Sequence, residues 1–380
     1  MRLLSMFLIL SILLSGCNAA QQDVLPETTI SSRTEAAAAP TEPVIPVDPM
    51  DALMASMTVE EKVGQLFLAR CPAEGAQEDL LAYHLGGYLL FGQDFDNKTP
   101  DSLTQTLDAW QYAAPIPLLI AVDEEGGTVC RISSHRAFRS RRFPSPRESY
   151  TAGGMEQVLS VETEKALLLS GLGINVNMGP VCDISTNAGA FMYERSLGQS
   201  PEETARFVSA TVQIYGNHGL GSVLKHFPGY GSNADTHTDI ITDSRSLEEL
   251  EAVDLLPFAA GISAGADAIL VSHNIVTAMD AEFPASLSPA VHDYLRSAMG
   301  FEGVIVTDDL VMEAITKAYG PEEAAVLAVL AGNDLLCSSE YQIQYPAVLD
   351  AVRSGRIPTD RLDASVMRIL QWKKELGLIF

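Results

Sequence analysis

Short apolar runs alternate with helical patterns through most of this 380-residue chain, and this alternation constrains its fold more than any other feature. Eight runs have the length of buried strands, and they lie at residues 63–69, 87–91, 117–122, 173–178, 222–226, 266–272, 303–307 and 334–337. Strands that alternate with helices belong to β/α units, which place their strands in a parallel sheet. Eight such units predict an α/β fold, a single (β/α)8 TIM-barrel domain.

Helix boundaries between these runs support the alternation. Three expected helix starts have the Ser/Thr-x-x-Glu spacing of a capping box, at Thr58, Ser200 and Ser246. Another helix is expected to begin at Pro321 and to stop at Gly332. A doubly wound open sheet is the competing fold, but it usually has fewer strands and a glycine-rich phosphate turn after the first one. This chain has Cys71-Pro72 at that place, which favours the barrel.

The composition restricts the kind of ligand. The chain has 24 Lys and Arg against 49 Asp and Glu, a formal net charge of −25. Nucleic acids and anionic lipid surfaces both bind basic patches, so this balance disfavours them as partners. A neutral, sugar-like ligand agrees better with such a surface.

Residues 1–16 have the features of an export signal. Arg2 precedes an apolar run from Leu3 to Leu14 that is too short to span a bilayer. The run ends in Leu-Ser-Gly-Cys, which resembles the lipobox of bacterial lipoproteins, where the new N-terminal cysteine carries acyl chains. We therefore expect an extracytoplasmic protein that is held at the bacterial cell membrane only by a lipid on Cys17. Ordinary secretion, with Cys17 as a bystander, is the alternative.

Residues 17–49 are rich in Ala, Thr, Glu and Pro and contain almost no large apolar side chains. This composition predicts a disordered tether. The folded domain is then expected over residues 50–380. Four further cysteines have no C-x-x-C pair among them and are expected to be small buried apolar residues, namely Cys71, Cys130, Cys182 and Cys337.

Polar side chains follow the expected strands at the end where a TIM barrel carries its active site. They close the third to the seventh apolar run and are Asp123, Glu124, Asn177, Asp183, Lys225, His226, His273, Asp308 and Asp309. Polar groups that close a buried run must be either satisfied structurally or used in function. Because so many of them gather at one end, we expect a functional site there.

The segment KHFPGYGSNADTHTD at residues 225–239 brings a lysine, two histidines and two aspartates into one glycine-bearing loop. Further motifs are AVDEEGG at 121–127, ERSLG at 194–198 and GVIVTDDL at 303–310. Together they resemble glycoside hydrolase family 3, in its single-barrel β-N-acetylglucosaminidase branch. The resemblance runs from about Asp51 to Phe380.

The resemblance implies a retaining exo-β-N-acetylglucosaminidase without cofactor or metal, which acts on cell-wall-derived glycans or muropeptides through a covalent glycosyl-enzyme. Asp308 matches the nucleophile, and an ionised carboxylate is what such an attack requires. Lys225 is expected to keep that carboxylate charged. His237 matches the residue that transfers protons, and Asp235 the one that orients its ring. Either Asp308 or Asp309 could instead cap the following helix. Neighbouring strand residues point opposite ways, so we expect one of the two to do each job, with attack by Asp308 and the cap from Asp309.

Six further residues match positions that hold the sugar, and they are Asp123, Arg131, Arg195, Lys225, His226 and His273. A carboxylate can accept hydrogen bonds from two hydroxyls, and Arg or Lys can donate to hydroxyl or acetamido oxygens. Two of the six have structural alternatives. Arg195 could form a salt bridge with Glu194 or Asp183, and His273 could be a core histidine that the backbone satisfies.

Other functions stay open from the residues alone. Another family 3 β-glycosidase or a glycosyl phosphorylase would use the same matched positions. A metal-dependent barrel hydrolase would need His226, His237, His273 and Asp308 as ligands, but the first expected strand has no H-x-H pair to begin such a site. A non-catalytic glycan-binding lipoprotein predicts damaged catalytic positions, and all of them are present. The chain ends at Phe380, so we expect no second sandwich domain of the kind that many family members carry.

Overall fold

Eight parallel strands form the centre of the structure, a computed structural model that describes residues 48–231 and 241–380. The strands are β1 (Phe67–Arg70), β2 (Gly87–Leu90), β3 (Leu119–Val122), β4 (Val176–Asn177), β5 (Gly221–Phe227), β7 (Ala268–Val271), β9 (Val304–Thr307) and β10 (Leu336–Ser338). They are hydrogen-bonded in the order β10-β1-β2-β3-β4-β5-β7-β9. A parallel bridge between Val306 and Leu335 joins the two ends of this order. The expected (β/α)8 barrel is therefore confirmed.

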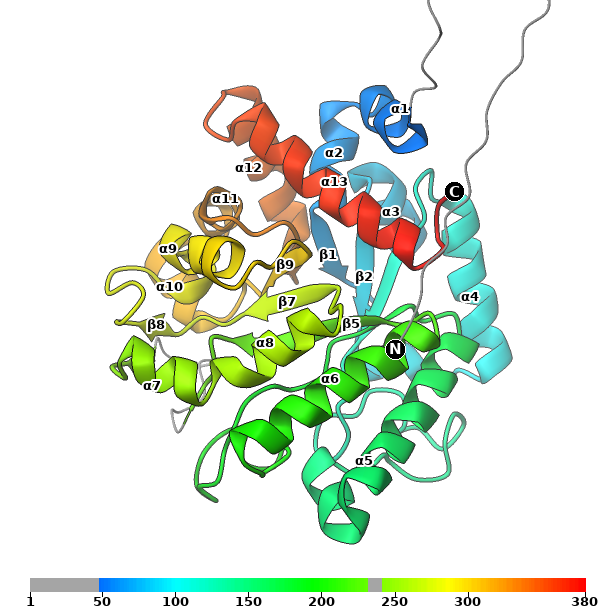
Figure 1. Ribbon diagram of the computed structural model, residues 1–380. Coiled ribbons are helices and arrows are strands. Elements are labelled where there is room, and N and C mark those ends of the chain that lie inside the picture. The colour runs from blue at the N-terminus through cyan, green and yellow to red at the C-terminus, as the bar shows by residue number, and fades with distance from the viewer. Residues whose placement is uncertain (1–47, 232–240) are drawn as a thin grey trace, which may run out of the picture. The chain divides into compact units, whose positions relative to one another are not determined.

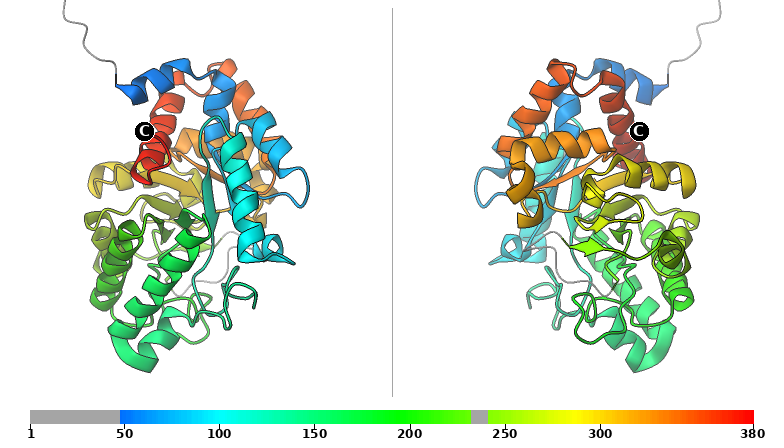
Figure 2. Two further views of the ribbon diagram at one scale, coloured as in Figure 1. Left: turned by 90° about the vertical axis from the view of Figure 1, so that its right-hand side faces the viewer. Right: turned by 90° about the vertical axis from the view of Figure 1, so that its left-hand side faces the viewer.

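The helices lie outside the strands (Figures 1 and 2). They are α1 (Pro49–Ser56), α2 (Val59–Gln65), α3 (Ala76–Tyr83), α4 (Pro100–Ala113), α5 (Pro146–Gly171), α6 (Pro201–Asn217), α7 (Leu247–Ala252), α8 (Leu255–Ser263), α9 (Pro289–Asp293), α10 (Glu313–Tyr319), α11 (Pro321–Ala331), α12 (Tyr341–Arg353) and α13 (Thr359–Glu375). Short 3-10 helices at Gly92–Phe95 and Ala285–Leu287 and a π-helical turn at Tyr294–Ala298 lie between them. Two short strands, β6 (Thr242–Asp243) and β8 (Ile275–Val276), form a separate parallel pair.

The helix starts that the sequence predicts are confirmed by their caps. The side chains of Thr58, Ser200 and Ser246 each accept a hydrogen bond from the backbone N–H three residues later. Helix α11 spans Pro321–Ala331 and ends at Gly332, whose φ of 130° is rare for residues with a side chain. These helix starts could be predicted from the sequence because a cap depends on only a few neighbouring residues.

The first expected strand, at residues 63–69, is partly wrong. Its first three residues belong to helix α2, and β1 begins only at Phe67. Val63, near the end of the helix, and Phe67 are both fully buried. A buried helix end that is followed directly by a buried strand gives one continuous apolar run in the sequence. Hydrophobic periodicity cannot show where the helix ends and the strand begins.

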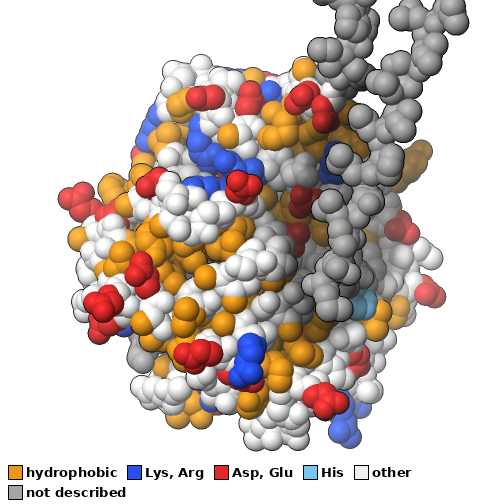
Figure 3. All heavy atoms as spheres, viewed as in Figure 1, with side chains coloured by type: hydrophobic (Ala, Val, Ile, Leu, Met, Phe, Trp, Pro, Cys, Tyr) orange, Lys and Arg blue, Asp and Glu red, His pale blue; other side chains and the backbone are white. Residues whose placement is uncertain are grey.

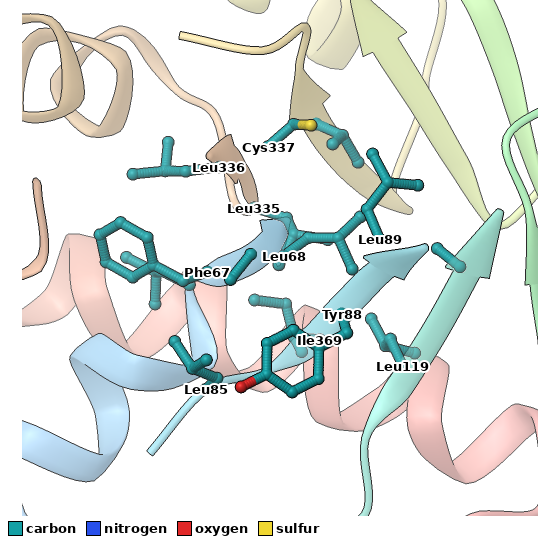
Figure 4. Close-up of a cluster of buried hydrophobic side chains, with 14 of the residues drawn as sticks. Phe67, Leu68, Leu85, Tyr88, Leu89, Leu119, Leu335, Leu336, Cys337 and Ile369 are labelled. Carbon is teal, nitrogen blue, oxygen red and sulfur yellow. The ribbon is translucent and has the colours of Figure 1, made fainter. Parts of the chain in front are cut away.

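Apolar side chains from neighbouring strands and from α13 pack together in the core (Figure 4). Each of the following is at most 4% exposed: Phe67, Leu68, Tyr88, Leu89, Leu119, Leu336, Cys337 and Ile369. Full burial of a large apolar side chain stabilises a fold by about 1.5–3 kcal/mol relative to exposure. This packing fixes the strands whose carboxyl ends carry the polar residues.

The four cysteines after Cys17 all lie in the described part of the chain. Cys71, Cys130, Cys182 and Cys337 are buried free thiols, as expected. Acidic and basic side chains are interspersed with apolar ones on the face shown in Figure 3. Within residues 48–231 and 241–380, no helix has the length and apolarity to cross a membrane. The predicted export signal, Cys17 and all but the last two residues of the predicted tether lie outside the described residues.

Candidate active site

A cavity of about 680 Å³ lies at the carboxyl ends of the barrel strands. Every one of the eight strands contributes a lining residue at or next to that end, and these are Arg70, Leu89, Asp123, Met178, His226, Leu270, Asp308 and Cys337. Parallel strands bring their carboxyl ends to one face of a barrel, so residues far apart in sequence meet there. This is the place where the sequence predicts a functional site.

The cavity brings together most of the described residues that were predicted for the site. Its lining includes Asp123, Arg131, Arg195, Lys225, His226 and Asp308. His273 is not part of this lining. The predicted proton-transfer residues Asp235 and His237 lie outside the described residues, although the motif that contains them starts at Lys225 in the cavity.

A network of charged side chains forms one wall of the cavity. The ammonium of Lys225 lies 2.7 Å from Asp123 Oδ1 and 2.7 Å from Glu125 Oε1. Arg195 donates two hydrogen bonds to Glu125, of 2.9 Å from Nε and 2.7 Å from Nη2. Arg131 lies 3.6 Å from Asp123. Arg195 therefore does form a salt bridge, but its partner is Glu125 and not Glu194 or Asp183.

Burial and charge act in opposite directions on this network. Burial alone would raise the pKa of Asp123, but the charges of Lys225 and Arg131 hold it below its ordinary value. The same balance holds the pKa of Glu125 well below its ordinary range, because Arg195 and Lys225 outweigh burial. The pKa of Lys225 is raised although burial lowers it, since two carboxylates surround the ammonium. All these groups are therefore charged at neutral pH.

His226 is held in one orientation by groups on both sides of its ring. Its Nδ1 donates to Asp183 Oδ2 at 2.7 Å, and the same oxygen accepts its backbone N–H at 3.0 Å. On the other side, Nε2 lies 3.1 Å from Nη2 of Arg195. A guanidinium can only donate, so Nε2 is the acceptor and the proton is on Nδ1. This tautomer connects Asp183 to the network through His226.

Asp308 and Asp309 have different surroundings. Asp309 accepts hydrogen bonds from the backbone N–H groups of Val311 and Ser339, each at 3.2 Å, and from Ser339 Oγ at 2.5 Å. Burial raises the pKa of Asp309. Asp308 Oδ1 accepts one bond, from the Asp309 N–H at 2.9 Å. Helix α10 has its N-cap at Met312 without a side-chain cap, so the expected capping by Asp309 is wrong. Asp309 instead bonds to two loops, the one after β9 through Val311 and the one after β10 through Ser339.

The expected pairing of Lys225 with Asp308 is not found. The ammonium of Lys225, on β5, forms ion pairs with Asp123 and Glu125, which lie in the loop after β3. Strands β3, β4 and β5 are consecutive neighbours in the barrel. In the described parts of the chain, no cation lies within 4.0 Å of the Asp308 carboxylate.

His273 is fully buried and does not line the cavity. Its Nδ1 lies 2.7 Å from Ser286 Oγ, and its Nε2 donates to the carbonyl of Asp309 at 3.1 Å. The contacts of His273 therefore match the alternative prediction, a buried core histidine that hydrogen-bonds to the backbone. His273 supports the turn that carries Asp308.

Sequence reasoning missed several residues of the cavity. Glu125 was quoted only as part of a motif, although it is the carboxylate that joins Arg195 to Lys225. Arg70 ends β1 and lies 4.4 Å from the centre of the Phe91 ring, and Arg131 lies 5.2 Å from the same ring. A polar residue at the end of an apolar run was the available signal for Arg70.

The rival prediction of a metal site requires several ligating side chains close together in the described residues. Among them, no group of three or more His, Cys, Asp or Glu side chains is arranged to hold a metal ion. His237, which that prediction requires, lies outside the described residues.

Comparison with known proteins identifies the family. The glycosyl hydrolase family 3 N-terminal domain matches residues 58–372 of the chain. The chain belongs to glycosyl hydrolase family 3. The family match covers the whole barrel from α2 to α13, so the cavity is that of a glycoside hydrolase.

Relatives of this family 3 chain share its sequence and its fold. The β-hexosaminidase LpqI of Mycobacterium tuberculosis is 31% identical, over 91% of this chain and 92% of its own. A family 3 β-N-acetylglucosaminidase from Paenibacillus sp. str. FPU-7 is 33% identical, with a TM-score of 0.79 over 85% of this chain. The present chain spans only 63% of that enzyme. A family 3 glycosyl hydrolase from Mycobacterium smegmatis is 31% identical, with a TM-score of 0.75, over 84% of this chain and 98% of its own.

Proposed function

We propose that this family 3 enzyme is a retaining exo-β-N-acetylglucosaminidase that acts on cell-wall-derived glycans or muropeptides. The observation that carries the proposal is the cavity in which Asp308 and the network of Asp123, Lys225, Arg195 and Glu125 line one space. Relatives at 31–35% identity that are named β-hexosaminidase support the choice of sugar.

The charged network is suited to hold a sugar ring. Asp123 is an ionised acceptor for hydroxyl hydrogens, and Lys225 and Arg195 are donors to hydroxyl or carbonyl oxygens. The network is already paired, so little reorganisation is needed when a sugar binds. Arg131 also lines the cavity and lies 3.6 Å from Asp123, so it places a second cation beside that carboxylate.

Asp308 is proposed as the nucleophile. Its Oδ1 accepts the Asp309 N–H, which fixes the carboxylate, and Oδ2 is the oxygen that attacks. The attack forms a bond between Oδ2 and the anomeric carbon while the bond from that carbon to the leaving oxygen breaks. Water then cleaves the ester and releases the sugar with its original anomeric configuration.

His237 is proposed as the acid that protonates the leaving oxygen and the base that later takes a proton from water. Histidine titrates near neutral pH, so one side chain can serve in both steps. Asp235 is proposed to orient the ring and to favour its protonated form. Lys225 and His226, which begin the same motif, lie in the cavity and support this placement.

The proposal is tested with residues 47–380, which form a compact unit of their own. The protein is incubated with 4-nitrophenyl β-glycosides of N-acetylglucosamine, glucose and xylose. We expect cleavage of the N-acetylglucosaminide, and Asp308→Ala should lower kcat by roughly 10³-fold or more. Asp360→Ala is a matched control, since Asp360 also accepts the N–H of the next residue at 2.9 Å but lies exposed on α13. An inactive wild type, or full activity of Asp308→Ala, would reject the proposal.

The same incubation in phosphate buffer distinguishes hydrolysis from phosphorolysis. A hydrolase releases free N-acetylglucosamine, whereas a phosphorylase would release its glycosyl phosphate. We expect only the free sugar.

We also propose that residues 1–16 are removed on export and that a lipid on Cys17 anchors the enzyme to the outer side of the bacterial cell membrane. Residues 17–49 would then hold the barrel away from the bilayer. Expression of the full chain with Cys17→Ala tests this. We expect the wild type in the detergent-soluble membrane fraction and the variant outside it, and equal partitioning would contradict the anchor.

A further inference from the structure

A second cavity, of about 630 Å³, adjoins the active-site cavity. The two cavities have Thr128 and Glu194 in common as lining residues. The rest of the second cavity is lined by the loop after β3 and by the first turns of helix α5. A further cavity of the described structure, of about 510 Å³, shares no lining residue with the active site. The second cavity is therefore the one into which a substrate can extend from the active site.

The loop after β3 is strongly basic, although the chain as a whole is acidic. Residues 131–147 contain six arginines and no Asp or Glu, in a chain with a formal net charge of −25. Three of these arginines are held by carboxylates or backbone carbonyls of the fold. The other three are exposed and form no ion pair with the described residues, and they are Arg136, Arg141 and Arg142. The loop therefore has positive charge that is available to an anionic ligand.

Of these three exposed arginines, only Arg142 lines the second cavity. Its backbone is fixed on both sides, because its carbonyl accepts from Nη1 of Arg139 at 3.1 Å and the next N–H, that of Phe143, donates to Ser133 Oγ at 3.2 Å. Phe143 is fully buried, and the guanidinium of Arg139 lies 4.0 Å from the centre of its ring. Arg142 therefore extends from a rigid part of the loop.

Two carboxylates also line the second cavity, but neither neutralises Arg142. Glu148 Oε2 accepts the Ser145 N–H at 2.7 Å, in the capping box at the start of α5. Glu194 is exposed at the boundary between the two cavities. In the described structure, neither carboxylate lies within 4.0 Å of the Arg142 guanidinium. A ligand anion can therefore pair with this cation.

We propose that the second cavity receives the leaving group of the substrate, and that Arg142 binds a carboxylate on that group. This inference rests on the proposed function, because the leaving group is the part that lies beyond the sugar that Asp308 attacks. A guanidinium and a carboxylate form two parallel charge-assisted hydrogen bonds, which fix both geometry and charge. The carboxylate can belong to an acidic sugar or to a peptide on that sugar. Arg142 thereby makes the enzyme select acidic leaving groups.

The test compares one neutral with two acidic leaving groups. The substrates are 4-nitrophenyl β-N-acetylglucosaminide, N-acetylglucosaminyl-β-1,4-N-acetylmuramic acid, and the same disaccharide with a peptide. The peptide is attached through the carboxyl group of the muramic acid, so each acidic substrate carries carboxylates from one source. We expect Arg142→Ala to lower kcat/KM roughly 3- to 10-fold for an acidic substrate, mainly through KM, and less than about twofold for the nitrophenyl substrate. A loss with only one acidic substrate identifies the source of the carboxylate.

Arg141→Ala is the matched control. Arg141 is also an exposed arginine whose carbonyl accepts from Nη1 of Arg139, but it does not line the second cavity. We expect this variant to keep the wild-type kinetic constants with all three substrates. Arg142→Lys keeps the charge and should recover part of the loss. The effect of Arg142→Ala should also shrink as the salt concentration rises, because salt screens exposed charges.

Ala152→Trp tests the second cavity without changing a charge. Ala152 is exposed on α5 and lines the second cavity but not the active-site cavity. The indole would occupy space that the leaving group needs, so we expect kcat/KM to fall for both disaccharide substrates and to stay unchanged for the nitrophenyl substrate.

The outcomes separate this inference from the proposed function. An active wild type would overturn the inference alone if Arg142→Ala lowered kcat/KM equally for neutral and acidic substrates, or for none of them. The same selective loss in Arg141→Ala, or full activity of Ala152→Trp on both disaccharides, would also overturn it. A wild type that is inactive on all three substrates would overturn the proposed function and this inference with it.

Discussion

The charged side chains that line the cavity form ion pairs with one another. Glu125 is central, because it accepts from Arg195 through both oxygens and also contacts Lys225. Removing one partner of a buried ion pair is costly, since the other partner stays buried and unpaired. The network therefore supports the fold and the site at once.

Glu125→Gln tests this double role. The amide keeps the shape but removes the charge, so we expect kcat/KM to fall at least roughly 10-fold and the free energy of unfolding to fall by about 3 kcal/mol. Glu164→Gln is the control, because Glu164 also accepts from both Nε and Nη2 of an arginine, Arg139, but is 55% exposed. Urea unfolding and steady-state kinetics measure both. An equal loss in the two variants would contradict the account.

Lys373 leads to a prediction about pH and stability. It is fully buried, and burial lowers its pKa from 10.5 to about 7, with Gln65 Oε1 at 2.7 Å. Its pKa is depressed in the folded state, so its contribution to stability is complete above pH 10.5 and is lost as pH falls towards 7. The loss is at most about 1.4 kcal/mol per pH unit.

We therefore expect Lys373→Met to be more stable than the wild type at pH 7, and the difference to shrink as pH rises towards 10. Denaturant unfolding across this range measures it. The exposed neighbour Lys374 provides the control Lys374→Met, for which we expect no such slope. A difference that is independent of pH would show that Lys373 is charged in neither state or in both.

At the scale of elements, local signals were predictable and tertiary pairings were not. The caps at Thr58, Ser200 and Ser246 depend on residues within one turn, and the structure has them. The partner of Arg195 depends on how the loops after β3 and β4 meet, and sequence spacing carries no information about that. For this reason its salt bridge was expected with the wrong residues.

The capping of α6 has a measurable consequence. Ser200 accepts the Glu203 N–H at 3.3 Å, so Ser200→Ala should lower the free energy of unfolding by about 1 kcal/mol. Kinetic constants should stay unchanged, because Ser200 does not line the cavity. Thr151→Ala, which removes a hydroxyl inside α5 that is not a cap, should cost less. Differential scanning calorimetry distinguishes them, and an equal decrease in Tm would contradict the role of the cap.

At the scale of the whole molecule, the barrel explains why the site could be found from sequence. Strand ends meet at one face of a closed parallel sheet, so polar residues that end successive apolar runs must come close together. The sequence therefore predicts one site for Asp123, Lys225 and Asp308, and these three residues line one cavity. Which of these residues pair with each other could not be predicted, because the pairing depends on how the loops fold. Lys225 pairs with Asp123, in the loop after β3, and not with Asp308.

The proposed mechanism requires that Asp308 forms the covalent glycosyl-enzyme. The most direct measurement uses His237→Ala with 2,4-dinitrophenyl β-N-acetylglucosaminide, because the good leaving group permits attack while the missing base slows hydrolysis. Rapid quenching, proteolysis and mass spectrometry then locate the adduct. We expect the mass of one N-acetylhexosaminyl residue on the peptide that contains Asp308. An adduct on another residue, or turnover without any adduct on Asp308, would contradict the account.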